Sequence, residues 1–190
     1  MRIGLAQINP TIGDHEGNAA RILEFAGRAA REGADLVLFP ELSINGYPPR
    51  DLLEVPAFVR QGTEALERLA ARVRRPAVLV GVAVPNPEPS GRPLQNAAAL
   101  LADGRVLAWR QKRLLPFYDV FDEERYFEPC RSNDPVELLG KRLGITICED
   151  LWNVEGALQR RYRQPDPVAA LVRAGAEILV NVSSLSLIHI

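Results

Sequence analysis

The chain has 190 residues, of which 47% are hydrophobic and 25% are charged, and its formal net charge is −1 at pH 7. This is the composition of an ordinary globular domain with a sizeable core, and the charge gives no electrostatic reason to expect nucleic acid or an anionic membrane surface as a partner. No apolar run approaches the roughly 20 residues of a membrane-spanning helix, and the amino-terminal stretch MRIGLAQINP is too polar for a signal peptide.

Strands and helices are predicted to alternate in the first half of the chain. Apolar runs predict strands over 2–8, 34–41 and 76–85. Asp14 is placed to cap a first amphipathic helix, and apolar side chains at helical spacing predict a second helix over 58–73.

The second half of the chain contains the clearest turn signal. Residues 94–112 have the pattern of two strands joined by Asp-Gly, which predicts a β-hairpin. A loop rich in aromatic and acidic residues is expected over 113–135, followed by strands over 141–150 and 176–184 with a helix over 155–174 between them. A hairpin among alternating strands and helices indicates a mixed sheet in a layered α/β fold.

Motifs that bind nucleotide phosphates are absent from the sequence. It contains neither a glycine-rich GxGxxG turn nor a GxxxxGK[ST] loop, so these residues carry no visible nucleotide site of their own. The two cysteines, Cys130 and Cys148, are too few for a disulfide framework or a metal site, and a reducing cytoplasm is the simplest setting for them.

Three polar residues stand where apolar strands end. Glu41 follows LVLFP, Lys112 follows RVLAWRQ and Cys148 follows LGITI. The thiolate is the reactive form of cysteine, and a nearby lysine ammonium would stabilise it. A carboxylate within hydrogen-bond distance could take the thiol proton, while the lysine and a backbone N–H could hold an oxyanion. Together the three residues predict nucleophilic catalysis without a histidine.

Each of these residues also has an ordinary structural interpretation. A cysteine at the end of an apolar strand is usually a small core residue. Glu41 could cap a backbone N–H in a loop, and Lys112, between Gln111 and Arg113, could be a solvated charge. The three residues lie 71 and 36 positions apart, so only the fold can bring them together.

Three blocks of sequence around these residues resemble the signatures of a known family. FPELSINGYPPRDLL, RQKRLLPFYDVFDEERYF and GITICEDLW are similar to the three signature blocks of the nitrilase, or carbon–nitrogen hydrolase, superfamily. Within that superfamily, GYPPRDLL, LPFYDVFDEERYF and CEDLW resemble the glutaminase domains of glutamine-dependent NAD synthetases. The resemblance covers residues 1–184, and it implies an α-β-β-α sandwich with mixed sheets and a Glu-Lys-Cys triad.

The resemblance implies a role for each member of the triad. Glu41 would be the general base, Lys112 would stabilise the tetrahedral oxyanion, and Cys148 would be the nucleophile. The matching positions of the family assign these roles, and the spacing of the residues does not.

The resemblance also implies contacts with glutamine. Tyr118, Phe121 and Glu123, in the loop over 113–127, are expected to bind it, with the aromatic rings enclosing its aliphatic stem and the carboxylate receiving its α-ammonium or the released ammonia. Ser183 is a further expected glutamine contact. The alternative is that the two aromatic residues simply pack under a loop and that Glu123 shares a solvated acidic face with its neighbours.

The carboxyl-terminal end departs from the family pattern. The family continues this strand in the manner of N-x-S-x-S-P, and its last serine contacts glutamine, but position 185 here is leucine. We therefore expect 1–184 to be an incomplete, C-terminally truncated carbon–nitrogen hydrolase domain, and 185–190 to be an atypical tail, such as an artefact of sequence assembly or cloning. On this interpretation His189 carries no functional weight.

By resemblance, the chain would hydrolyse the side-chain amide of glutamine through a cysteine thioester. The ammonia would serve the ATP-dependent conversion of deamido-NAD to NAD by a synthetase domain that is absent from this chain. No cofactor is expected for the glutaminase segment, ATP and Mg²⁺ are expected for the synthetase domain, and the whole protein is expected to be a cytoplasmic homo-oligomer. Two alternatives remain open: a stand-alone nitrilase-type amidase acting on another small amide, and an inactive structural or interaction fragment.

Overall fold

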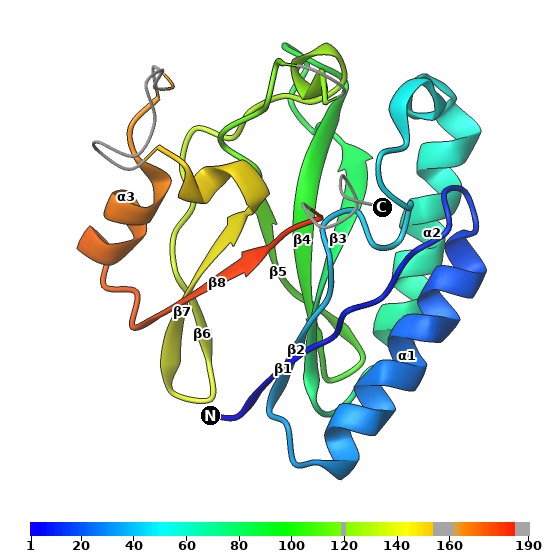
Figure 1. Cartoon of the computed structure of the whole chain (residues 1–190), viewed down its shortest axis with the longest axis vertical. Helices are drawn as coiled ribbons and strands as arrows, with labels where there is room; N and C mark the ends of the chain where they lie inside the picture. The colour runs from blue at the N-terminus through cyan, green and yellow to red at the C-terminus, as the bar shows by residue number, and fades with distance from the viewer. Residues whose placement is uncertain (119–120, 154–161, 163, 185–190) are drawn as a thin grey trace.

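The computed structural model describes residues 1–118, 121–153, 162 and 164–184. Their strands form two sheets that pack face to face, with helices on the outer sides of both sheets (Figure 1). The layers therefore follow the order helix, sheet, sheet, helix. The prediction of an α-β-β-α sandwich with mixed sheets is confirmed.

The larger sheet has five strands in sequence order. They are β1 (Ile3–Leu5), β2 (Leu36–Leu38), β3 (Ala77–Pro85), β4 (Leu94–Ala102) and β5 (Arg105–Gln111). The pairs β1–β2 and β2–β3 are parallel, whereas β3–β4 and β4–β5 are antiparallel. β2, which pairs in parallel with a strand on each side, is a short apolar run whose three residues are all buried.

The predicted hairpin is the turn between β4 and β5. Its two central residues, Asp103 and Gly104, have φ angles of 53° and 78°. Positive φ at both positions is what a type I′ turn requires, and Asp-Gly is among the sequences that favour it. The hairpin extends to Lys112, whose backbone N–H donates to the Asn96 carbonyl at 2.8 Å.

The smaller sheet has three strands in the described chain. They are β6 (Val136–Leu138), β7 (Lys141–Ile147) and β8 (Ile178–Val182), with β7 in the centre, antiparallel to β6 and parallel to β8. The sequence did not predict β6, because three residues are too short for an alternating pattern to be recognised. β7 also ends earlier than the predicted strand over 141–150.

Two long helices cover the outer face of the five-stranded sheet. α1 (His15–Arg31) begins at Asp14, whose carboxylate accepts a hydrogen bond from the Gly17 N–H at 3.0 Å, and α2 (Pro56–Arg72) has proline at its first position, which suits a helix start. Both helices pack against the sheet through their apolar faces. The first predicted helix is present with its Asp14 cap, and the second agrees with the predicted range 58–73 within about two residues.

The helix predicted over 155–174 is wrong for residues 162 and 164–166, which are not helical, and the described helix begins only after Asp166. α3 (Pro167–Arg173) is capped by Asp166 and packs against β7 on the far side of the smaller sheet. Residues 154–161 and 163 lie outside the described residues, as does the tail over 185–190.

The two sheets share an apolar core, and the polar ends of their strands gather above it. Three short 3-10 turns stand near these strand ends: η1 (Arg50–Glu54), η2 (Glu123–Arg125) and η3 (Cys148–Leu151). Among the residues that the structure describes, no helix has the length and apolarity that a membrane crossing requires.

Candidate active site

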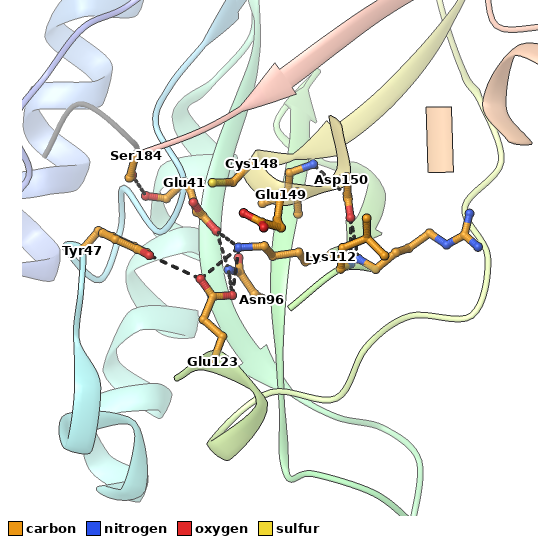
Figure 2. A network of polar contacts seen from close by, with 12 residues as sticks. Glu41, Tyr47, Asn96, Lys112, Glu123, Cys148, Glu149, Asp150 and Ser184 are labelled. Carbon is orange, nitrogen blue, oxygen red and sulfur yellow. Dashed lines mark hydrogen bonds and ion pairs between the residues drawn. The ribbon is translucent and has the colours of Figure 1, made fainter. Parts of the chain in front are cut away.

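Cys148 lies at a sharp bend between β7 and η3. The strand ends at Ile147, and Cys148, only 4% exposed, opens the 3-10 turn with a φ of 44°. Positive φ is unfavourable for a residue that carries a Cβ, and such strain persists only where surrounding contacts hold it. The bend points the thiol into the cluster of charged residues in Figure 2.

Glu41 and Lys112 come from the other sheet and meet directly. Glu41 follows β2, Lys112 follows β5, and both side chains are fully buried. The Lys112 Nζ donates to Glu41 Oε1 at 2.7 Å. The structure therefore brings the three predicted triad residues into one cluster, with the thiol just after β7 facing an ion pair from the five-stranded sheet (Figure 2).

Glu123 belongs to the same cluster, which the sequence did not reveal. Lys112 Nζ lies 2.9 Å from both of its carboxylate oxygens. Its neighbours Asp122 and Glu124 are exposed, but Glu123 is only 3% exposed, because the left-handed residue Asp122 (φ 38°) turns the chain inward before η2. Glu123 is thus not part of a solvated acidic face, and its predicted contact with glutamine stays a prediction.

Asn96 and Tyr47 complete the polar shell around the two carboxylates. The Asn96 amide donates to Glu41 Oε1 at 2.8 Å and to Glu123 Oε2 at 3.3 Å, and the Tyr47 hydroxyl donates to Glu123 Oε1 at 3.4 Å. Neither residue was a sequence candidate. Asn96 sits next to Gln95 in an otherwise apolar strand (LQNAAALLA), and a polar side chain on a buried strand was the signal that could have identified it.

The cluster contains one ammonium and two carboxylates, and its electrostatics follow from that composition. Burial alone would lower the pKa of Lys112, but Glu123 and Glu41 outweigh it and hold that pKa well above its usual value. Burial raises the pKa of Glu123 to about 7, against the opposing effect of the lysine. Lys112 therefore stays charged, while Glu123 lies close to its titration point at neutral pH.

The Cys148 thiol is held in its neutral form. Burial raises its pKa, the Glu41 carboxylate raises it further, and the opposing effects of Lys112 and of a hydrogen bond with Ser183 are smaller. Lys112 favours the thiolate, as the sequence predicts, but burial and the Glu41 carboxylate outweigh it. The thiol needs a base, and Glu41 Oε2 is buried without a hydrogen-bond partner among the described residues.

Two serines from the end of β8 reach this cluster. Ser183 hydrogen-bonds the thiol, and the buried Ser184 donates from Oγ to the Glu41 carbonyl at 2.8 Å. Ser183 was predicted to bind glutamine, and its observed partner is the candidate nucleophile itself.

The aromatic residues predicted to contact glutamine lie around Glu149. The hydroxyls of Tyr118 and Tyr162 both donate to Glu149 Oε1 at 2.9 Å, although Glu149 itself is only 3% exposed. Phe121 packs edge to face on Tyr118, with ring centroids 5.6 Å apart. Tyr118 is 43% exposed, whereas Phe121 is half-buried and packs against the apolar cluster that includes Tyr47 and Phe127. Together Tyr118 and Phe121 form an aromatic rim, and packing under the loop holds for Phe121.

No group of three or more His, Cys, Asp or Glu residues in the described ranges has an arrangement that could hold a metal ion.

Comparison with known proteins agrees with this geometry. Residues 2–189 match the carbon–nitrogen hydrolase family model. The glutamine-dependent NAD(+) synthetase of Synechocystis sp. is 43% identical over 186 residues, which cover 96% of this chain and 33% of that protein. The corresponding protein of Thermotoga maritima is 41% identical, with 97% of this chain and 30% of that protein covered. The chain thus spans about a third of the length of these curated relatives.

Solved structures show the same fold, and with it the family. The glutamine-dependent NAD+ synthetase of Acinetobacter baumannii aligns with a TM-score of 0.82 and 32% identity, over 96% of this chain and 32% of that one. An amidase from Nesterenkonia sp. AN1, with the acetamide moiety of fluoroacetamide on its active-site cysteine, aligns with a TM-score of 0.72 and 26% identity, over 96% and 64%. The match over nearly the whole sequence and the clustered glutamate, lysine and cysteine lead to one conclusion: the chain belongs to the carbon–nitrogen hydrolase family.

Proposed function

We propose that this chain hydrolyses the side-chain amide of glutamine through a thioester on Cys148. The observation that carries the proposal is the arrangement around the thiol. Glu41 Oε2 is buried and has no partner among the described residues, while its other oxygen is bound to the Lys112 ammonium. A neutral thiol beside an available carboxylate oxygen and a buried cation is suited to attack on a carbonyl carbon.

In the proposed acylation step, Glu41 takes the thiol proton as the Cys148 sulfur forms a bond to the amide carbon. Lys112 and the Glu149 N–H stabilise the negative oxygen of the tetrahedral intermediate. Glu41 then returns the proton to the amide nitrogen, the carbon–nitrogen bond breaks, and ammonia leaves. Water, deprotonated by the same carboxylate, hydrolyses the thioester and restores the thiol.

Glutamine recognition is assigned to the aromatic rim. Tyr118 and Phe121 enclose the aliphatic stem, and the carboxylate of Glu149, which already accepts the Tyr118 hydroxyl, attracts the α-ammonium. Both oxygens of Glu123 accept hydrogen bonds from the Lys112 ammonium. In this proposal Glu123 therefore holds Lys112 in place and binds the released ammonia, and it does not contact the aliphatic stem of the substrate.

The proposed fate of the ammonia comes from the relatives, which are glutamine-dependent NAD(+) synthetases about three times as long as this chain. In a protein of that length, ammonia would react with ATP-activated deamido-NAD to give NAD. ATP and Mg²⁺ belong to that second reaction, and the hydrolysis proposed for these residues needs neither. The homo-oligomeric state and the cytoplasmic location expected from the sequence stay predictions.

The test is glutamine hydrolysis by the purified chain, measured as glutamate and ammonia released. Cys148→Ala should abolish it, and Cys130→Ala, which removes the other cysteine, should leave it unchanged. Cys130 is half-buried in a loop, and its thiol hydrogen-bonds neutral groups of Gln111, Ser132 and Asn133. A wild-type chain that is folded but releases no glutamate would refute the proposal for these residues and favour the inactive-fragment alternative.

A second measurement concerns a longer form of the protein that includes a synthetase part. There, Cys148→Ala should abolish NAD formation from glutamine but retain NAD formation from saturating ammonium salt, because the thiol is needed only to break the amide. Equal loss of both activities in a folded variant would show that hydrolysis and synthesis are not separate reactions.

A stand-alone amidase is the second candidate, because the chain aligns over about two thirds of the Nesterenkonia amidase. This alternative predicts that small aliphatic amides are hydrolysed faster than glutamine. Comparing kcat/KM for acetamide, propionamide and glutamine distinguishes the two, and the proposal requires that glutamine be preferred.

A further inference from the structure

Asp150 is a buried carboxylate without a role in the reaction described above. It lies two residues after Cys148 in η3 and is 1% exposed. Among the described residues it accepts hydrogen bonds from three backbone N–H groups. Burying a carboxylate costs free energy unless it keeps the hydrogen bonds that it accepts. The role of Asp150 can therefore be inferred from the three backbone N–H groups that donate to it.

The first oxygen reaches across to the larger sheet. Asp150 Oδ1 accepts from the backbone N–H groups of Arg113 at 3.0 Å and Leu114 at 2.9 Å. These residues directly follow Lys112, so the carboxylate holds the backbone from which the buried ammonium projects. In Figure 2, dashed lines join the Asp150 carboxylate to the backbone that follows Lys112.

The second oxygen closes the bend around the candidate nucleophile. Asp150 Oδ2 accepts from the Ile147 N–H at 3.0 Å, so a hydrogen bond joins the residue before Cys148 to the second residue after it. Cys148 is the residue with positive φ inside that closed turn. The same side chain therefore holds the strained bend and, through its other oxygen, the strand end of the opposite sheet.

We propose that Asp150 is a positioning residue: its carboxylate fixes the Cys148 thiol relative to the Lys112 ammonium by joining the two sheets at the site. It touches neither the substrate nor the reacting atoms. Its effect is on the geometry with which the thiol, its base and the oxyanion-binding ammonium meet the amide. The proposal rests on the proposed function for its activity measurement, but not for its labelling measurement.

The test is Asp150→Asn, which keeps the size of the side chain and replaces one acceptor oxygen with an NH₂ donor. The oxygen of the new amide can accept a hydrogen bond either from the Ile147 N–H or from the N–H groups of Arg113 and Leu114. Its NH₂ group then points at the remaining N–H donors, with which it cannot form a hydrogen bond. A misplacement of about 1 Å at a reacting centre costs on the order of 10²-fold in rate, so kcat for glutamine hydrolysis should fall by about that factor. KM should change far less, because the aromatic rim is untouched.

The second readout is the rate at which iodoacetamide alkylates Cys148, with Cys130 of the same molecule as internal reference. Base-assisted attack depends on the position of the thiol, so Asp150→Asn should lower the Cys148-to-Cys130 ratio by about tenfold or more. Asp14→Asn is the matched control, since Asp14 also accepts a backbone N–H, at the start of α1, and asparagine caps helices equally well. It should change neither readout.

Several outcomes overturn the proposal. They are a loss of kcat no greater than the loss of folded protein measured by circular dichroism, a change confined to KM, or an unchanged labelling ratio in folded Asp150→Asn. Asp150→Glu is the second variant; if neither variant folds, Asp150 is a folding residue and the proposal fails. If wild-type protein does not hydrolyse glutamine but the labelling ratio falls as expected, the proposed function fails and the positioning role stands.

Discussion

At the scale of single residues, the site depends on how two buried carboxylates share one lysine. Glu41 and Glu123 both bind the Lys112 ammonium, and Asn96 donates to both carboxylates. In the structure without substrate, the lysine is therefore the counter-ion of the two carboxylates, and it binds an oxyanion only during the reaction. When the carbonyl oxygen of a substrate becomes negative, it must compete with these two carboxylates for the positive charge of Lys112.

The first prediction concerns the two lysines of the chain. Lys112→Met leaves two carboxylates facing each other without a cation, so it should lower the free energy of unfolding at pH 7 by about 3–5 kcal/mol. Lys141 pairs with Glu177 on the surface, and Lys141→Met should leave stability nearly unchanged. Urea unfolding followed by circular dichroism measures both. Equal effects of the two substitutions would contradict the ion-pair description.

The same residue has a separate effect on rate. Lys112→Ala should reduce glutamine hydrolysis by roughly 10²–10³-fold, as the loss of an oxyanion donor does. Lys112→Arg should not restore it, because the planar guanidinium is larger and differently hydrated. Initial rates corrected for the folded fraction test this, and near-wild-type activity in Lys112→Arg would show that charge alone is sufficient.

The pKa of Glu123 predicts how stability depends on pH. Burial raises this pKa from 4.5 to about 7, so the native state holds a proton that the unfolded chain releases. The contribution to stability is complete below pH 4.5 and is lost as the pH rises through 7. As the pH rises from 4.5 through 7, the free energy of unfolding of wild type should therefore fall relative to that of Glu123→Gln. Glu124→Gln, at an exposed neighbour, should give a curve parallel to wild type; a difference that moves in favour of wild type with rising pH would contradict the assignment.

At the scale of elements, the site is made by what happens immediately after strands end. β7 stops at Ile147 because Cys148 adopts positive φ and η3 begins. A regular strand would alternate its side chains across the sheet, whereas this bend turns the thiol out of the sheet and toward the charges of the other layer.

The strained bend gives a prediction about glycine. Because glycine adopts positive φ without steric cost, Cys148→Gly should be at least as stable as Cys148→Ala, although both lack the thiol. Ile147 provides the control, since its φ is −123°. There the glycine variant should be less stable than the alanine variant by about 0.5–1 kcal/mol. Thermal unfolding of the four variants decides, and a glycine penalty of equal size at both positions would show that the bend is not strained.

At the scale of the whole molecule, the apolar contact between the sheets keeps the parts of the site together. Glu41 and Lys112 follow strands of the larger sheet, and Cys148 follows a strand of the smaller one. Loss of packing between the layers should therefore affect stability and catalysis together.

Leu79 tests this dependence. It is fully buried in β3 within the core between the sheets, so Leu79→Ala should lower the free energy of unfolding by about 2–5 kcal/mol and reduce glutamine hydrolysis at temperatures near the new midpoint. Leu5, 77% exposed on β1, is the control, and Leu5→Ala should have little effect on either quantity. A stable, fully active Leu79→Ala chain would show that the layers do not need this contact.

Local sequence patterns predicted the elements because the forces that set them act over a few residues. The Asp14 cap, the helical spacing within α2 and the Asp-Gly turn were each readable from neighbouring side chains, and each is present. The three residues of β6 and the early end of β7 were not readable, because pairing across a sheet and a bend held by Asp150 depend on contacts between distant segments.

By itself, the sequence determined the kind of fold, the family resemblance and the identity of the three candidate catalytic residues. Only the tertiary structure decided what surrounds them. It placed Glu123 on Lys112, put Asn96 between the two carboxylates, left Glu41 Oε2 without a partner and held the Cys148 thiol neutral. The reason is physical: hydrophobic periodicity is written in neighbouring residues, whereas burial and the distances between charges, which set protonation, exist only after the two sheets have packed.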